Sequence, residues 1–414
     1  MNEIYSRERA AGIDIENLNR LRILLCGAGN TGSHFVERAI RNMIKQLFII
    51  DYDKEGYQPH NFAHSSTLLD PVEDVGKPKA ETLAMRANEK LLTGGHYVGK
   101  TMNVRDIGPE VIRQFDMVLG FFDNIDARAY LYQIAREANV PFMEIGLSEN
   151  GDWQLQIEDH ALDAPCYCCN LGKREVAASC KYTYLNDVAN GIAPVTDVSG
   201  AEAAACAMDA LMRYFSPKGF ECNVKFRFDS SKFSIDKLIG VKNPECDVCS
   251  CEAVDKNKLI HLEGSVDEVT YRRFEQMARE ETGKELRFCL PDVFITKDYC
   301  PKCGKEKAFM RPEHRIAMSD VVCPECREKP GERFLALHVN VKSDWVDGCD
   351  EVPERLKDRM LYELGFAYGG HIVAMDDDFN EYYFTFDGDM KLLSDLNRED
   401  KQYATYIKSS ASAT

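Results

Sequence analysis

The sequence predicts an α/β protein with a Rossmann-like domain first and an α+β domain after it. The short apolar run "RILLC" at residues 22–26 ends in a glycine-rich turn, and a second run, "QLFIID" at residues 46–51, ends in an acidic residue. Residues 33–45 have helical spacing, so the unit is strand, turn, helix and strand, with both strands buried and parallel. Because single cores stop growing at roughly 250 to 300 residues, a chain of 414 residues is expected to hold at least two domains.

Further elements extend this first unit. Apolar runs bounded by polar residues predict two more strands, and the intervals between them have helical spacing. The stretch "GAEAAACAMDALMRYF" has the alanine-rich composition of a strong helix. The expected strands are residues 116–122 and 141–146, and the expected helices are residues 77–93, 125–138 and 200–215.

The later part of the chain predicts a second domain. Ser265 followed by Glu268 has the form of a helix capping box, and Phe274, Met277 and Ala278 share one face of the helix that would follow. Beyond it we expect a strand at 333–341, a helix from Pro353 to Leu364 ended by Gly365, and strands at 371–375 and 382–386. The predicted division is a first domain at 1–252, a helical linker at 253–294, a cysteine-bearing ribbon at 295–330, a C-terminal α+β domain at 331–407 and a disordered tail at 408–414.

Composition narrows the class of protein. Asp and Glu outnumber Lys and Arg by 68 to 51, which gives a net charge of -17 and would repel a nucleic-acid backbone. The amino terminus, "MNEIYSRERAAG", has no apolar segment of a secretory signal, and nowhere do eighteen apolar residues run together. We therefore expect a soluble cytoplasmic protein that binds neither nucleic acid nor membranes.

Eight of the sixteen cysteines fall into four Cys-x-x-Cys pairs, which indicates zinc rather than disulfides. Four thiolates favour a closed, structural zinc site without an open catalytic position. The last two pairs are separated by nineteen residues and predict a zinc ribbon, whereas the long gap between the first two leaves Cys168 or Cys251 as alternative ligands. The pairs are Cys166 with Cys169, Cys246 with Cys249, Cys300 with Cys303, and Cys323 with Cys326.

The glycine turn predicts a nucleotide site. Gly27, Gly29 and Gly32 form GxGxxG between a strand and a helix, and Asp51 ends the second strand nineteen residues after Gly32. Glycine lets a backbone approach phosphate closely, the helix amino terminus supplies N–H groups, and an acidic residue accepts ribose hydroxyls. These residues alone fit any ligand that contains adenosine, so a nicotinamide cofactor of an oxidoreductase remains an alternative.

Several motifs, which follow one another in the same order as in a known family, narrow the choice between these adenosine-containing ligands. The segments "DYDKEGYQPHN" from Asp51, "VGKPKAET" and "FFDNIDAR" from Phe121 resemble the adenylating fold of ubiquitin-activating enzymes and of bacterial enzymes that activate sulfur-carrier proteins. The amino-terminal "YSR" resembles a further motif of that family, and "APCYCC" and "NPECDVC" resemble its two zinc knuckles. The resemblance covers about residues 1–252 and implies an adenylyltransferase of the ThiF-like fold.

The resemblance also implies roles for the site residues. Asp51 would hold the ribose of ATP, with Asp53 beside it at the strand end, while Lys79 and Asn61 would contact the phosphates and Asp123 would hold Mg²⁺. Such a site needs charge neutralised on the triphosphate but no strong general base.

Two further positions concern phosphate contacts. Arg7 would reach the phosphates of a neighbouring subunit, which implies a homodimer. His64 stands where the family has an arginine, three residues after Asn61, and carries less charge near neutral pH.

The substrate implied by the resemblance is a ubiquitin-like protein that ends in glycine. Cys180 lies between the first zinc knuckle and the alanine-rich helix, where transferring members of the family keep a cysteine, and Lys173, Arg174 and Lys181 would favour its thiolate. Thioester formation at Cys180 and hand-over to a conjugating enzyme bound by the C-terminal domain would follow. The alternatives are a spare thiol at this position, a sulfur-carrier activator without a thioester step, the oxidoreductase, and a non-catalytic scaffold.

Overall fold

The computed structural model divides the chain into two compact units. The first comprises Met1–Val104, Ile112–Ala253 and Leu393–Thr414, and the second comprises Arg105–Val111 and Val254–Leu392. The structure describes residues 4–91, 94–123, 125–148, 150–160, 165–170, 196–246, 248, 254–300, 303–316, 320, 323, 325, 344–346 and 352–396.

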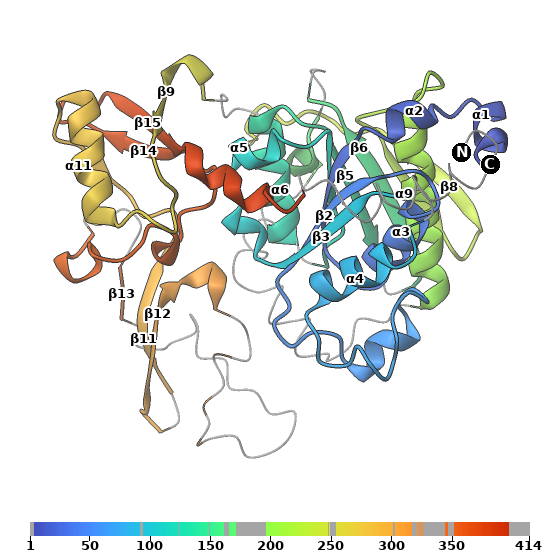
Figure 1. Ribbon diagram of the computed structural model, residues 1–414, viewed down its shortest axis with the longest axis horizontal. Helices are drawn as coiled ribbons and strands as arrows, with labels where there is room; N and C mark the ends of the chain where they lie inside the picture. Colours follow the sequence, from blue (N-terminus) through green and yellow to red (C-terminus); the bar gives the residue numbers. More distant parts are fainter. Residues whose placement is uncertain are drawn as a thin grey trace, which may run out of the picture. The chain divides into compact units, whose positions relative to one another are not determined.

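The first unit is built on a mixed sheet (Figure 1). Among the described residues its strand order is β3-β2-β1-β4-β5-β6-β7-β8; the first five strands are parallel and the last three pair antiparallel. The strands are β1 (Arg22–Cys26), β2 (Gln46–Asp51), β3 (His96–Thr101), β4 (Met117–Gly120), β5 (Phe142–Leu147), β6 (Trp153–Glu158), β7 (Lys225–Asp229) and β8 (Ser234–Leu238).

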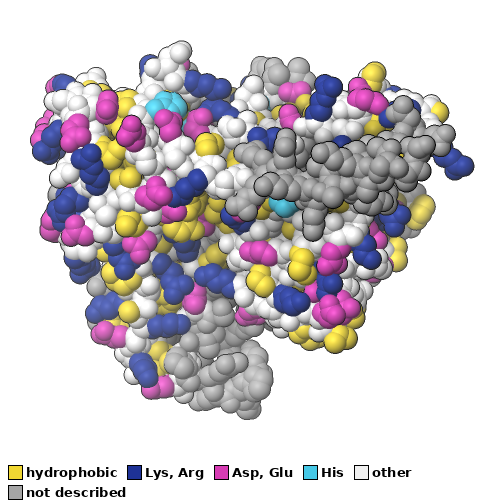
Figure 2. Space-filling view, in the orientation of Figure 1, with side chains coloured by type: hydrophobic (Ala, Val, Ile, Leu, Met, Phe, Trp, Pro, Cys, Tyr) yellow, Lys and Arg dark blue, Asp and Glu magenta, His cyan; other side chains and the backbone are white. Residues whose placement is uncertain are grey.

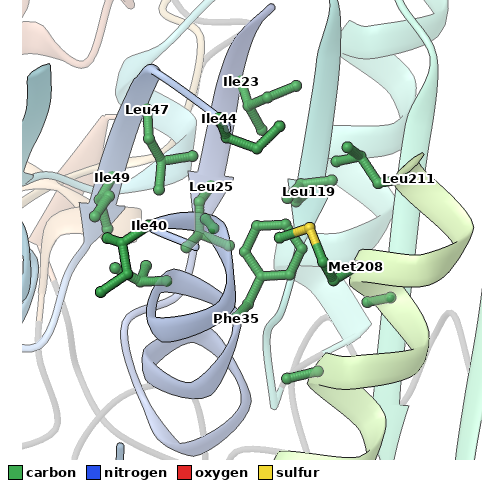
Figure 3. Close-up of a cluster of buried hydrophobic side chains, with 14 of the residues drawn as sticks. Ile23, Leu25, Phe35, Ile40, Ile44, Leu47, Ile49, Leu119, Met208 and Leu211 are labelled. Atoms are coloured by element: carbon green, nitrogen blue, oxygen red, sulfur yellow. The ribbon is translucent and has the colours of Figure 1, made fainter. Parts of the chain in front are cut away.

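Successive side chains of each strand point to opposite faces of the sheet, and helices cover both of these faces. In the described residues the helices of the unit are α1 (Ser6–Ala10), α2 (Ile15–Leu18), α3 (Asn30–Ala39), α4 (Lys79–Asn88), α6 (Ile125–Ala138) and α9 (Asp197–Tyr214), with short 3-10 turns η1 (Pro59–Ala63) and η3 (Tyr167–Asn170). Figure 3 shows Phe35 of α3 beside Met208 of α9, against the apolar side chains of β1 and β4. On the other face, Tyr132 of α6 packs edge to face against Phe142 of β5, with ring centroids 5.8 Å apart.

The strand order fixes where a ligand would bind. Chain connections run from β1 through β2 to β3 on one side, and from β4 to β5 on the other, so the direction of winding reverses between β1 and β4. In open α/β sheets ligands bind at this switch point, outside the carboxyl ends of the strands. The glycine turn follows β1 at that place.

The second unit combines a small sheet with one long helix and a ribbon. Its four-stranded sheet has the order β10-β14-β15-β9, and three further strands pair as β12-β11-β13. The elements are β9 (Leu259–Leu262), α11 (Tyr271–Thr282), β10 (Arg287–Phe288), β11 (Phe294–Tyr299), β12 (Glu306–Pro312), β13 (Asp344–Val346), β14 (Ile372–Met375) and β15 (Glu381–Phe386), with 3-10 turns η4 (Lys256–Lys258), η5 (Glu313–Arg315), η7 (Glu354–Leu356), η8 (Tyr362–Leu364) and η9 (Asp387–Leu393). The segment predicted as a helical linker, 253–294, thus supplies strands and the main helix of this unit.

Residues 105–111, which lie between β3 and β4 in the sequence, belong to the second unit. The segment holds most of the turn η2 (Val104–Asp106) and of helix α5 (Pro109–Ile112). Its backbone pairs with the stretch around Tyr368, because Gly108 N donates to Tyr368 O and Tyr368 N donates to Asp106 O. A Cβ on Gly108 would lie 2.4 Å from the backbone of Gly370, so only glycine allows this approach.

Most predicted elements are present, including the helix that carries Phe274, Met277 and Ala278 on one face; one predicted capping box and one predicted helix are wrong. The strands expected at 22–26 and 46–51 and the helix expected at 125–138 occur with those bounds, and the strands expected at 116–122, 141–146, 371–375 and 382–386 and the helices expected at 77–93 and 200–215 occur with shifted ends. The capping box at Ser265 does not form: α11 begins after Thr270, whose hydroxyl accepts from the backbone N of Arg273 (3.2 Å). The region Pro353–Leu364 holds two 3-10 turns instead of a helix, although Gly365 ends the second with a positive φ of 102°.

The surface drawn in Figure 2 carries acidic and basic side chains interspersed with apolar ones. In the described part of the chain, no helix combines the length and apolar composition that a membrane crossing requires. The strand expected at 333–341 and the tail at 408–414 lie outside the described residues.

Candidate functional site

The glycine turn after β1 has the geometry of a phosphate cradle. Gly27 has a φ of +107°, and a Cβ there would lie 2.4 Å from Phe121 O; a Cβ on Gly32 would lie 2.0 Å from Gly27 O. Both positions therefore require glycine for the packing of turn and helix. Gly29, the N-cap of α3, differs, because a Cβ there would meet nothing within 4 Å. The open space at Gly29 is where a ligand phosphate could approach the helix amino terminus.

Two side chains fix the turn. Asp51 Oδ2 accepts from Ala28 N (2.7 Å), and Tyr57 Oη donates to Ala28 O (2.7 Å). Asp51 Oδ1 accepts from Asp53 N (2.9 Å), so one carboxylate joins the turn to the end of β2. Burial raises the pKa of Asp51, and the nearby Lys79 ammonium acts against that shift. Sequence reasoning singled out Asp51 but missed Tyr57.

Lys79 begins α4 and lies among carboxylates. Its Nζ is 2.6 Å from Asp53 Oδ2, and its side chain is 13% exposed. Burial acts to lower the pKa of Lys79, but the charges of Asp51, Asp53 and Asp123 outweigh it, so the pKa is raised. Lys79 is thus held as a cation at the carboxyl ends of the strands, where it could exchange Asp53 for a phosphate oxygen.

The remaining residues predicted to contact the nucleotide lie in η1, in the loop after β4 and in α1. Asn61 lies in η1, where its Oδ1 accepts from Gln58 N (2.8 Å), which leaves Nδ2 as the atom able to donate to a phosphate. His64 ends η1 and is half-buried, and Asp123 is exposed just after β4. Arg7 is exposed and lies in the short helix α1. The predicted contact between Arg7 and a neighbouring subunit stays a prediction.

Arg128 and Glu144 form a buried pair beside the end of β4, and sequence reasoning missed Glu144. Arg128 Nε donates to Phe122 O (3.1 Å), and its Nη2 donates to the same oxygen. Arg128 Nη1 lies 4.0 Å from Glu144 Oε2, and the Glu144 side chain is 1% exposed. The nearest signal in the sequence was the position of Arg128 after "DNIDA", but no local pattern marks Glu144.

The first cysteine cluster suits a tetrahedral metal. Sulfur atoms of Cys166, Cys169 and Cys246 lie together, with Sγ–Sγ distances of 3.6 Å from Cys166 to each of the other two. A zinc–sulfur distance of about 2.3 Å implies sulfur atoms roughly 3.8 Å apart at the corners of a tetrahedron. Cys166 and Cys246 are buried, and Cys168 is not part of the group. Cys249 and Cys251 lie outside the described residues.

The second cluster lies at the turn between β11 and β12. It contains Cys300, Cys303 and Cys323, and the Sγ atoms of the last two are 3.8 Å apart. Cys300 is buried whereas Cys303 is exposed, so this group is more open than the first. Cys326 lies outside the described residues, as do Cys180 and the three basic residues expected near it, Lys173, Arg174 and Lys181.

A sheet with a glycine turn at its switch point and a lysine among strand-end carboxylates defines an α/β protein with a nucleotide-binding site. Residues 5–248, more than half of the chain, match the model of the ThiF family, and the chain belongs to that family. The resemblance inferred from the sequence is confirmed.

The similar proteins are distantly related to this chain or match only part of it. The NEDD8-activating enzyme E1 catalytic subunit of Arabidopsis thaliana is 31% identical over 115 residues, which cover 28% of this chain and 24% of that protein. Ubiquitin-like modifier-activating enzyme 5 of Rattus norvegicus is 26% identical over 167 residues, 38% of this chain and 40% of that protein. The chain thus spans less than half the length of these relatives. The crystal structure of E. coli MccB with AMPCPP and MccA is similar in fold, with a TM-score of 0.51 and 17% identity over 60% of this chain and 74% of that chain.

Proposed function

We propose that this protein adenylates the C-terminal carboxylate of a small ubiquitin-like protein that ends in glycine. One carboxylate oxygen of that carrier attacks the α-phosphorus of ATP, the bond from this phosphorus to the bridging oxygen breaks, and pyrophosphate leaves. The product is an acyl-adenylate, and no proton has to be moved. Membership of the ThiF family and the similarity to activating enzymes support this class of reaction over hydride transfer.

The observation that carries the proposal is the position of Lys79. A cation among Asp51, Asp53 and Asp123, next to a glycine turn at the switch point, supplies the fixed charges that phosphoryl chemistry requires. The backbone N–H groups at the start of α3 would contact the phosphates, and Asn61 and His64 could add donors. Mg²⁺, held by Asp123, would neutralise charge on the leaving pyrophosphate.

The edge of the sheet at β8 favours a protein as the substrate. Among the described strands β8 is one of the two edges of the sheet, and four apolar side chains at or beside it are strongly exposed: Phe233 (82%), Ile235 (58%), Ile239 (76%) and Val241 (80%). An apolar patch on an exposed edge is typical of a surface that another protein covers. We propose that the carrier docks here while its tail extends to the nucleotide.

We further propose two structural zinc ions. The sulfur spacing in the two clusters, 3.6 and 3.8 Å, supports zinc held by thiolates, with Cys249 and Cys326 completing the two sets. Neither site would take part in adenylation, because four thiolates leave no open position on the metal.

The later steps of the proposed reaction rest on Cys180 and the second unit. Attack of the Cys180 thiolate on the acyl carbon would release AMP and leave the carrier as a thioester. We propose that the second unit then binds a conjugating enzyme. We also propose that this protein works as a homodimer in which Arg7 of one subunit reaches the nucleotide site of the other. A sulfur-carrier activator would share adenylation and lack the thioester.

Pyrophosphate exchange into ATP tests the central proposal. The assay would use a panel of purified ubiquitin-like proteins ending in glycine, each beside a version without its final glycine. We expect exchange that requires Mg²⁺ and the intact tail and that is lost in Lys79→Ala. Absence of exchange with every carrier, together with absence of Mg²⁺-dependent ATP binding, would reject adenylation. A thiol-sensitive adduct that disappears in Cys180→Ala separates the thioester enzyme from the sulfur-carrier activator.

A further inference from the structure

Glu144 is a buried carboxyl group with unusual surroundings. It lies in the middle of β5, in register with Gly120 of β4 and with Gln156 of β6. Its residue is 1% exposed, and neither of its carboxylate oxygens has a hydrogen-bond partner among the described residues. The amide nitrogen of Gln156 donates instead to Glu158 Oε1 (3.0 Å). Because an unpaired buried carboxyl is costly, its presence calls for a functional explanation.

The charge that faces Glu144 is the guanidinium of Arg128, 4.0 Å away. Gly146, two residues further along β5, makes room for it, because a Cβ there would lie 2.7 Å from Arg128 Nη1. The guanidinium therefore lies against the strand and keeps its other donors for the carbonyl of Phe122. Burial raises the pKa of Glu144, while Arg128 and Lys225 act to lower it.

Phe122 directly precedes Asp123. Arg128 of α6 therefore holds the loop after β4 at Phe122, immediately before the carboxylate expected to hold Mg²⁺. Asp123 itself is exposed, so its direction depends on the backbone that carries it. Partners one step behind a metal ligand orient that ligand, and losing them weakens metal binding.

We infer that Glu144 and Arg128 are positioning residues for Asp123: the buried carboxylate holds the guanidinium in place, and the guanidinium holds the Phe122 carbonyl. This inference rests on the proposed function, because it requires Mg²⁺ and nucleotide at Asp123. Under this inference, the unfavourable free energy of burying the Glu144 carboxyl group is explained by the geometry of the metal site and not by a contribution to folding.

The test compares nucleotide binding with and without Mg²⁺. A fluorescent N-methylanthraniloyl ATP would be titrated into the full-length zinc-loaded protein in EDTA and in Mg²⁺. The variants are Glu144→Gln, which keeps the shape and removes the charge, and Arg128→Lys, which keeps the charge and removes the forked donors. Arg113→Lys is the matched control, because Arg113 Nη2 donates to Glu137 O (3.1 Å) at the opposite end of α6.

We expect the wild type and Arg113→Lys to bind nucleotide more tightly in Mg²⁺ than in EDTA. Glu144→Gln and Arg128→Lys should lose about tenfold of the affinity in Mg²⁺ and stay within about twofold of the wild type in EDTA. Unchanged affinity in Mg²⁺, or an equal loss in both buffers, would overturn the positioning role. Wild-type binding that does not respond to Mg²⁺ would instead reject the proposed function, so the two failures are distinguishable.

Discussion

Replacing Gly29 by alanine should separate nucleotide binding from stability. Gly29 is the N-cap of α3 with a φ of -77°, and the position of its Cβ has no atom within 4 Å. Alanine is a weaker N-cap than glycine, so we expect a loss of about 0.5 to 1 kcal/mol in the free energy of unfolding. The added methyl group, however, stands in the space that a phosphate needs in order to reach the helix amino terminus.

Gly32→Ala is the matched comparison, because this position is closed. Its Cβ would lie 2.0 Å from Gly27 O, far inside contact distance, so α3 would have to move away from the turn. Forcing extra volume into a packed site costs typically about 1 to 3 kcal/mol. Gly32→Ala should therefore lose stability and nucleotide binding together.

Urea unfolding and calorimetric titration with ATP and Mg²⁺ measure the two effects. For Gly29→Ala we expect unfolding within about 1 kcal/mol of the wild type and an affinity for ATP at least about tenfold weaker, a change of about 1.4 kcal/mol in binding free energy. The explanation is refuted if Gly29→Ala binds ATP as tightly as the wild type, or if it is destabilised as much as Gly32→Ala.

Three further predictions concern other parts of the chain. Lys79→Ala should lower the rate of pyrophosphate exchange about 100-fold or more, with Lys79→Arg recovering part of it, which steady-state kinetics of both variants would check. Metal analysis should find two zinc ions per chain, one for each cysteine cluster, and one in Cys166→Ser; unchanged content in that variant would contradict the first site. The pKa of His314 is raised: burial acts to lower it, but hydrogen bonds and charges of Asp106 and Asp292 outweigh burial. The charged form of His314 therefore stabilises the fold fully below the ordinary histidine pKa near 6.5, and this stabilisation is lost as pH rises through the higher folded pKa. The melting temperature should fall over that pH range in the wild type and not in His314→Gln.

The candidate nucleotide site could be proposed from the sequence because its residues lie in local motifs. The glycines, Asp51 and Lys79 each stand at the end of a strand or the start of a helix, and the rule that ligands bind at the carboxyl ends of parallel strands brings them together. Glu144 was not predictable in this way. Its surroundings depend on the register of β5 against β4 and β6, and nothing in the segment "PFMEIG" indicates which side chain faces Arg128.

The error at Ser265 has a similar cause. Ser265 and Glu268 satisfy the spacing of a capping box, but Ser265 Oγ donates to Asp389 Oδ1 (2.7 Å), a residue 124 positions later. Asp389 also accepts from the backbone N of Val266 (2.9 Å) and of Gly369 (2.8 Å), which holds this segment in a turn. Thr270 therefore takes the N-cap five residues further on. A distant partner decides between two acceptable local caps, and the sequence does not reveal that partner.

The same limit applies to the division of the chain. The predicted boundary at residue 252 separates His314 from Asp106, although Asp106 Oδ1 lies 3.3 Å from His314 Nε2 and both residues belong to the second unit. Arg315 and Tyr362 also bind Asp106, so this one buried carboxylate joins three side chains of the second unit. Because Asp106 belongs to a segment between β3 and β4, the second unit cannot complete this network from residues 254–392 alone. Each unit is discontinuous in the chain. In the second unit, ion pairs of Asp106 and backbone hydrogen bonds of Gly108 join the two stretches, and neither is marked by composition or local spacing.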